Sequence, residues 1–397
     1  MPAKSTKYGN RGSTSFQPGD VSGKKINYSY SCLEGNQPGL KGMECSGGTV
    51  GYTTEGNGQL YKVHTFNASG SFVIDTASVN PKLPDEVEYL VVGGGGGGGN
   101  TLAGAGGAGG FRTNNPFTPN SDPTATGTPD ATYVGAPYPV TVGDTYAVTI
   151  GGGGGSSSIG SASKFYAPGA SFPDARAIYA AGGGEGGDGP GAGGNGGSGG
   201  GGGGYGTSSS PTNRQAAGTS DTDAALPVRQ GYSGGLGGWY PSGYGGGGGG
   251  GAGRQGYDGS NSAAPTTAGT WPTSTGGKGG DGILSPIGDS PPTINSGNGY
   301  YYAAGGGGGA YQPNMVGGNG GLGGGGGGGV KTGDAGEGGT GGINDGSDGA
   351  VPDGAGGAGG QYTGGGGGGG SHPARPGGNG GSGHVVVRYK IVPSQIT

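Results

Sequence analysis

The stretch Gly276-Gly-Lys-Gly-Gly-Asp-Gly-Ile-Leu284 has the residue types and spacing of a calcium site. It matches the nonapeptide GGxGxDxUx, through which successive turns of a β-roll share calcium ions. Such a roll needs tandem copies, but the only similar stretch, 183–188, is far away in the chain and is followed by Pro190 at the apolar position. Asp281 is therefore a weak calcium candidate, and we expect no resident metal.

Catalytic constellations are missing from the sequence. His64, His372 and His384 are far apart, and no HExxH or Gly-x-Ser-x-Gly motif stands in a suitable context. GxGxxG patterns recur, but with 120 glycines in 397 residues they carry no information about nucleotide binding. We expect a protein that is not an enzyme and that uses no cofactor.

The two cysteines, Cys32 and Cys45, enclose a turn-rich stretch that a disulfide can close. The alternative is two reduced thiols, which cytoplasmic synthesis favours. Two cysteines without clustered histidines are too few for a zinc site.

Aromatic residues with small polar neighbours are the best candidates for binding. Tyrosine and tryptophan supply a large contact area at a low cost in side-chain entropy, and loops on a rigid scaffold commonly carry binding sites. Trp239 and Trp271 lie in the longer loops and are the strongest candidates, although the same aromatics can also cover the glycine-rich backbone. The complete candidate set is Trp239, Tyr240, Tyr244, Tyr257, Trp271, Tyr311, Tyr362, His372 and Arg375.

The elements that must position these loops are unusual, because the chain has 120 Gly and 27 Pro. This composition is typical of disorder, yet only 11% of residues are charged and there are 22 tyrosines, which a disordered chain usually lacks. The net charge of −5 and the scattered basic residues argue against nucleic acid as a partner. No apolar run is long enough to insert in a membrane, and the N-terminus lacks the apolar middle of a secretory signal.

Several stretches have the alternation of β-strands. Residues 61–66 and 71–75 flank a turn and predict a hairpin, and residues 138–150 predict a second hairpin that turns at Gly143-Asp144. Two apolar runs, 87–92 and 384–392, bracket the glycine-rich part, and we expect them to pair. Helical periodicity is absent, so no α-helix of note is predicted.

Seven glycine runs follow the strand at 87–92. Between and beside them, Gly-Gly-Asn-Gly-Gly recurs and non-glycine residues tend to fall at every third position, as in Glu337 and Thr340. A period of three fits the left-handed polyproline-II backbone, whose N–H and C=O groups all point outward. Glycine helices of this kind can pack side by side and satisfy one another only if no Cβ intervenes. The runs are 93–99, 151–155, 199–204, 245–251, 305–309, 323–329 and 364–370.

Four pieces in a specific order carry a family resemblance: VEYLVVGGGGGGG, GAGGAGGFRTN, YPVTVGDTYAVTIGGGGG and GGNGGSGHVVVRYKI. Over residues 87–392 the chain resembles the glycine-rich domain of tailed-bacteriophage fibre proteins. Its texture is similar to the tail-fibre tip adhesins of T-even-like phages. That resemblance implies a sandwich of polyglycine-II helices whose distal loops select the host receptor. Residues 1–86 match no adhesin attachment domain that we can identify.

We therefore expect a mostly irregular, all-β protein in two parts. Residues 1–86 form a small β-rich domain that attaches to other virion proteins. Residues 87–397 form a polyglycine-II sandwich with aromatic loops, closed by the strand 384–392.

The expected function is that of a virion surface protein made in the host cytoplasm. A tail-fibre adhesin that binds a host surface glycan or outer-membrane protein is favoured. The alternatives are a structural or decoration protein of the capsid or tail, and a disordered glycine-rich matrix protein.

Overall fold

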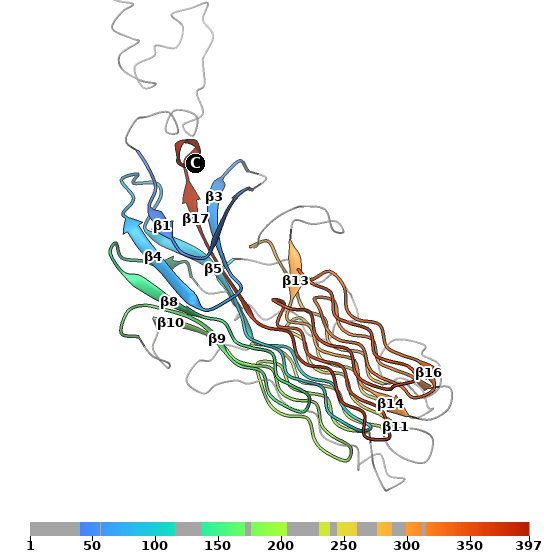
Figure 1. Cartoon of the computed structure of the whole chain (residues 1–397). Helices are drawn as coiled ribbons and strands as arrows, with labels where there is room; N and C mark the ends of the chain where they lie inside the picture. The colour runs from blue at the N-terminus through green and yellow to red at the C-terminus, as the bar shows by residue number, and fades with distance from the viewer. Residues whose placement is uncertain are drawn as a thin grey trace, which may run out of the picture.

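The computed structural model consists of β-strands and irregular segments. It describes residues 40–55, 57–115, 136–170, 176–204, 230–238, 244–259, 276–287, 299–311 and 315–396. Within these ranges there is no α-helix, as the sequence predicted, and the helical element that occurs is the 3-10 turn Pro393–Gln395. Figure 1 shows a β-sandwich from which an elongated glycine-rich region extends.

Two antiparallel sheets form the sandwich. The first has the strand order β2-β3-β17-β5-β6, with β7 also pairing with β5, and the second has the order β1-β4-β8-β9-β10. The strands of the first sheet are β2 (Thr49–Thr54), β3 (Leu60–Phe66), β17 (His384–Ile391), β5 (Glu86–Val92), β6 (Phe111–Thr113) and β7 (Tyr138–Pro139). Those of the second are β1 (Glu44–Ser46), β4 (Gly70–Thr76), β8 (Thr145–Thr149), β9 (Ser163–Tyr166) and β10 (Ala177–Ala180).

The expected pairing of the two bracketing strands is confirmed. Val385, Val386 and Val387 of β17 lie opposite Val91, Leu90 and Tyr89 of β5. Both strands are buried on both faces. One face packs in the core between the two sheets, and the other packs against the glycine-rich region through residues such as Phe111, Tyr302 and Ala303. Burial on both faces explains why these strands are continuous apolar runs.

The predicted hairpin of residues 61–66 and 71–75 is wrong. Both strands exist, but β3 pairs with β2 and β17, whereas β4 pairs with β1 and β8. The turn between them carries the chain from one sheet to the other, so that Phe66 and Phe72 both enter the core between the sheets. Alternation of apolar residues indicates the buried face of a strand but does not choose its partner.

The second predicted hairpin is wrong for the same reason. Gly143 has the positive φ of 82° expected of the turn residue, and the N–H of Asp144 donates to Thr141 O at 3.1 Å. However, β7 pairs with β5 in the first sheet, and β8 pairs with β4 and β9 in the second. This turn is also a crossing between sheets. Each sheet therefore contains strands that precede position 86 and strands that follow it. The predicted boundary between a domain of residues 1–86 and a domain of residues 87–397 stays a prediction.

Backbone hydrogen bonds organise the glycine-rich region. Successive N–H groups of Gly93–Gly99 donate in turn to three neighbouring segments, so that every third residue donates to the same segment. The carbonyl groups of the run accept from three further segments. The segments that receive the N–H groups are 104–110, 158–161 and 378–381, all antiparallel to this run. Those that donate to its carbonyl groups are 154–157, 183–186 and 367–370, all parallel to it. A single run thus has six neighbours.

Close spacing explains why these positions are glycine. A Cβ built on Gly94, Gly95 or Gly96 would lie well inside 3.0 Å of a carbonyl oxygen of a neighbouring segment. Backbone atoms cannot move away singly, because each carbonyl is itself held by a hydrogen bond. Buried backbone groups here are satisfied by other backbone rather than by a β-ladder.

Three small sheets complete the glycine-rich region. Two are antiparallel pairs, β11 with β14 and β12 with β13, and the third is the parallel pair of β15 with β16. Their bounds are β11 (Tyr244–Gly245), β14 (Ala310–Tyr311), β12 (Ile283–Ser285), β13 (Tyr300–Tyr302), β15 (Met315–Val316) and β16 (Gly333–Asp334).

Candidate functional site

The two ends of the glycine-rich region differ in their surroundings. Gly93 leaves β5 beside the sandwich, and we call this end proximal. Gly99 lies at the opposite end, which we call distal; it also contains β11, β14, β15 and β16, and residues 371–376 (Figure 1). Near the far end of the sandwich, the Gln395 side-chain oxygen accepts the Gly42 N–H at 2.9 Å. The described chain therefore begins and ends away from the distal end.

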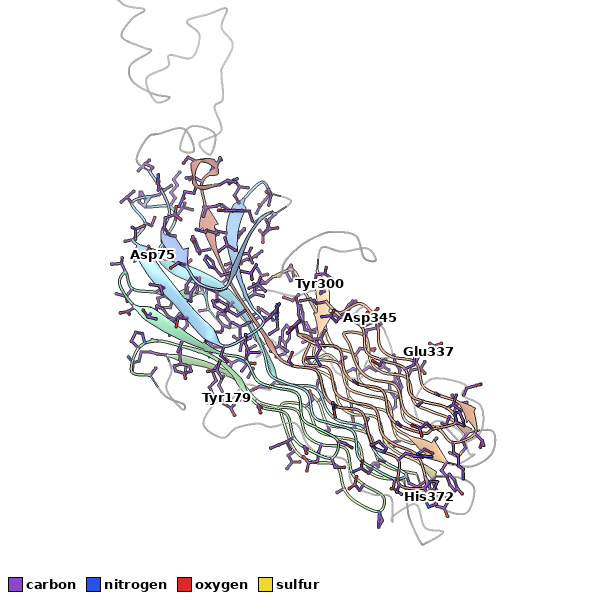
Figure 2. The ribbon with its side chains drawn as sticks, viewed as in Figure 1. Asp75, Tyr179, Tyr300, Glu337, Asp345 and His372 are labelled. Carbon is purple, nitrogen blue, oxygen red and sulfur yellow. The ribbon has the colours of Figure 1, made fainter. Side chains whose placement is uncertain are left out.

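Three of the predicted binding residues meet at the distal end. Tyr244 of β11 lies opposite Tyr311 of β14 in the antiparallel pair. The Tyr311 ring tilts against the His372 ring, with centroids 4.7 Å apart. All three side chains are half-buried, so their rings are held while an edge stays accessible. Figure 2 shows His372 at this end, far from Asp75 of the sandwich.

Charged groups flank the aromatic residues. Arg375 pairs with Asp353 at 2.9 Å, and both side chains are largely accessible, at 43% and 64%. The backbone carbonyl of Arg375 also accepts the N–H of Thr101, which ties the 371–376 turn to the end of the first glycine run. An exposed pair of this kind contributes little stability. Its groups remain available to a polar ligand.

A polar network closes the distal end beside this turn. The Asn100 amide group donates to Ser157 Oγ at 2.7 Å, and Ser156 Oγ donates to Asn100 Oδ1 at 2.6 Å. Ser157 Oγ in turn donates to Asp188 at 2.7 Å. These side chains supply hydrogen-bond partners at the distal end, where the glycine runs stop and neighbouring backbone no longer supplies them. Sequence reasoning missed these residues, although polar residues directly after glycine runs are a usable signal, and it interpreted Asp353 only as part of a polar loop with Asp345 and Asp348.

Two other candidates lie elsewhere. The Tyr257 ring packs under the Arg254 guanidinium at 4.6 Å, beside the middle of the run 245–251. Tyr362 is at the proximal end, where its N–H donates to Ser382 Oγ at 3.0 Å. Neither residue joins the distal group.

Trp239, Tyr240 and Trp271 lie outside the described residues. The described residues that flank them are at the distal end, because Gly238 donates its N–H to Gly245 O and Gly259 donates to Leu236 O. Gly276 donates to Val316 of β15 in the same way. The described residues Gly238, Gly259 and Gly276 thus lie at the same end as Tyr244 and Tyr311.

Asp281 has partners within the protein. It is almost fully buried, accepts the Leu322 N–H at 2.9 Å and pairs with Lys278 at 3.2 Å. Across the described ranges, no group of three or more His, Cys, Asp or Glu side chains is placed to hold a metal ion. The resemblance to a calcium-binding nonapeptide thus has a local explanation in which Asp281 satisfies a neighbouring backbone group.

Cys45 is a buried thiol that is not in a disulfide, and Cys32 lies outside the described residues. Burial raises the pKa of the Cys45 thiol to about 12. His64 and His384 are completely buried, and burial lowers the pKa of both, to about 4 for His384. Such groups stay neutral in the fold and have the environment of structural residues.

Comparison with known proteins gave no match. No family model, curated protein or solved structure resembles the chain closely enough to be reported. Nor does any helix in the described ranges combine the length and apolarity needed to cross a bilayer.

Proposed function

We propose that this chain is a bacteriophage virion surface protein, a tail-fibre adhesin whose glycine runs form a polyglycine-II sandwich. The supporting observation for the scaffold is the period-three rotation of hydrogen bonds from Gly93–Gly99 to six neighbours. Three residues per turn is the repeat of the polyproline-II backbone. At ~3.1 Å per residue, a seven-residue run spans about 22 Å.

The distal end carries the proposed binding site. Tyr244, Tyr311 and His372 gather there, and Arg375 and Asp353 add charged groups beside them. Aromatic rings with adjacent charged and amide groups suit a host surface glycan or an exposed loop of an outer-membrane protein. The scaffold holds these rings before binding, which reduces the entropy lost on association.

The sandwich end serves attachment to other virion proteins in this proposal. Both ends of the described chain meet there, through the hydrogen bond between Gly42 and Gln395. A protein fixed at that end projects its aromatic end outward. No step of this function requires a cofactor or bond-making chemistry.

Adsorption to host cells tests the function. Labelled purified protein should bind saturably to the bacterium that the phage infects, and Tyr311→Ala and His372→Ala should weaken that binding by about tenfold or more, as expected for aromatic anchors. Tyr362→Ala, at the proximal end, is the matched control and should bind like the wild type. Absence of saturable binding by folded protein, with the distal end buried against other subunits on intact particles, would instead indicate a decoration protein.

A further inference from the structure

One glycine run differs from the others in its exposure. Six of the seven runs are buried throughout, whereas Gly152, Gly153 and Gly155 of the run 151–155 are exposed. This run also has fewer neighbours: it exchanges backbone hydrogen bonds with the segments 93–99, 158–161 and 378–383. The side of this run that faces away from these segments is open, and we call 151–155 with Ser158 and Ile159 the open edge.

The fold itself does not require glycine at two positions of this edge, although a Cβ on Gly151, Gly153 or Gly154 would collide with a neighbouring carbonyl group. A Cβ built on Gly152 or Gly155 would meet nothing within 4 Å, and neither residue has a positive φ. At Gly96, by contrast, a Cβ would collide with the Gly184 carbonyl group. Glycine loses more conformational entropy on folding than alanine. At a position where the fold has room for a Cβ, glycine therefore lowers the stability of a single chain without making possible any close contact within it.

The open edge also has unused hydrogen-bonding groups. Among the described residues, no acceptor receives the N–H groups of Gly152, Gly153 and Gly155. Exposed segments outside the seven runs have side chains that accept such N–H groups: Asp348 accepts the Gly338 N–H at 2.8 Å and Asn319 accepts the Glu337 N–H at 3.0 Å. An edge of unpaired backbone groups is a template for pairing with another chain.

We propose that a second copy of this chain docks on the open edge, with the two 151–155 runs packed backbone to backbone. A two-fold axis perpendicular to the runs makes the two identical runs antiparallel. Antiparallel segments are the ones that receive the N–H groups of Gly93–Gly99 within the chain, so the geometry is one that this backbone already uses.

Charge favours a second copy at this edge and opposes one at the other side. Residues 150–163 and 376–383 include no charged side chain, and the carboxylate that contacts this segment, that of Asp188, accepts a hydrogen bond from Ser157 Oγ, so two copies can approach along 151–155 with little repulsion. The other side of the region carries Glu337 and Asp345, which Figure 2 shows on the side away from the 151–163 segment, and Asp334 and Asp348 belong to the same segments. Ile159, 62% exposed, adds an apolar contact next to the edge.

Sedimentation velocity over a wide concentration range tests the proposal on the full chain. Wild type should form a dimer, and Gly152→Glu/Gly155→Glu should weaken it by at least about tenfold, equivalent to about 1.4 kcal/mol. The matched control, Thr340→Glu/Gln361→Glu, adds the same charge at exposed positions outside the open edge and should dimerise like the wild type.

Hydrogen exchange at Gly94–Gly99 should be unchanged in the edge variant, which separates loss of the dimer from loss of the fold. Gly155→Ala provides a milder second variant that should also weaken the dimer. A wild type that remains monomeric, an edge variant that dimerises normally, or a control that weakens the dimer equally would each overturn the proposal.

Discussion

Placing a methyl group at Gly96 should strongly destabilise the glycine-rich region. The added Cβ would overlap the carbonyl group of Gly184, and the Gly183 carbonyl oxygen would lie only 2.9 Å away. The run must then move, although Gly96 donates to Gly107 O at 2.9 Å and accepts from the Gly367 N–H at 2.9 Å. Each buried backbone group left unpaired costs roughly 1–3 kcal/mol, so leaving only the N–H and the carbonyl group of Gly96 unpaired already costs roughly 2–6 kcal/mol.

That cost is a substantial fraction of the stability of a typical domain, about 5–15 kcal/mol. Gly96→Ala should therefore lower the denaturant midpoint strongly, and Gly96→Val should prevent normal folding. The matched control is Gly152→Ala, in a run that is equally glycine-rich but open, where the Cβ would meet nothing within 4 Å. Removing glycine there restricts the unfolded chain and should stabilise the protein by about 0.4–1 kcal/mol.

Chemical unfolding at low protein concentration, where a dimer does not contribute, measures both variants. The sign of the difference is the decisive result: Gly96→Ala destabilises and Gly152→Ala does not. If Gly96→Ala unfolded within about 0.5 kcal/mol of the wild type, as surface substitutions do, the runs would be flexible linkers and the close-packed arrangement would be refuted.

Three further predictions concern the sandwich. Because burial holds the His384 pKa at about 4 against an unfolded value near 6.5, the unfolded chain takes up a proton first, and about 3 kcal/mol of stability should be lost as the pH falls from 6.5 to 4. His384→Gln should flatten this part of a plot of unfolding free energy against pH, and an unchanged slope would contradict the assignment. Arg388 is buried against Glu55 and Glu88 at 2.7 and 2.6 Å, so Arg388→Met should cost about 2–4 kcal/mol in thermal unfolding, and adding Glu88→Gln should recover part of that loss. Cys45, whose pKa is about 12, should react with an alkylating reagent only after unfolding, and mass spectrometry showing rapid labelling of the native protein would contradict its burial.

The sequence predicts the strands of this fold better than their partners. Apolar runs identified β5 and β17 and their pairing, because strands buried on both faces have few alternatives. The hairpin predictions failed at β3 and β4, since alternation marks a buried face and a turn marks a reversal of the chain, but neither shows whether the reversal stays within one sheet. Whether the chain crosses to the other sheet after the turn depends on the second sheet, which is assembled from strands distant in sequence.

The candidate site shows a similar limit. Residue type alone suggested Tyr244, Tyr311, Tyr257 and Tyr362 as equals, and the structure puts the first two together and the others elsewhere. What the sequence lacks is the direction of each run. Run direction fixes which turns share an end, and it depends on hydrogen bonds between segments far apart in the chain.

A packed array of glycine backbone has a difficulty at its boundary, since outer runs must satisfy N–H groups that face no neighbour. At the sides this chain places a carboxylate or amide side chain opposite such groups, as Asp345 does for the Gly341 N–H at 3.1 Å and Asp258 for the Leu236 N–H at 2.8 Å. A short side chain at every third residue is what a three-residue repeat allows on one outer face. Asn319 of one Gly-Gly-Asn-Gly-Gly repeat likewise accepts the Glu337 N–H at 3.0 Å, which explains this copy as a boundary of the array rather than a ligand motif. By the same argument, Gly152 and Gly155 mark a boundary that lacks such side chains, and the proposed second copy would supply the acceptors that their N–H groups lack within the described chain.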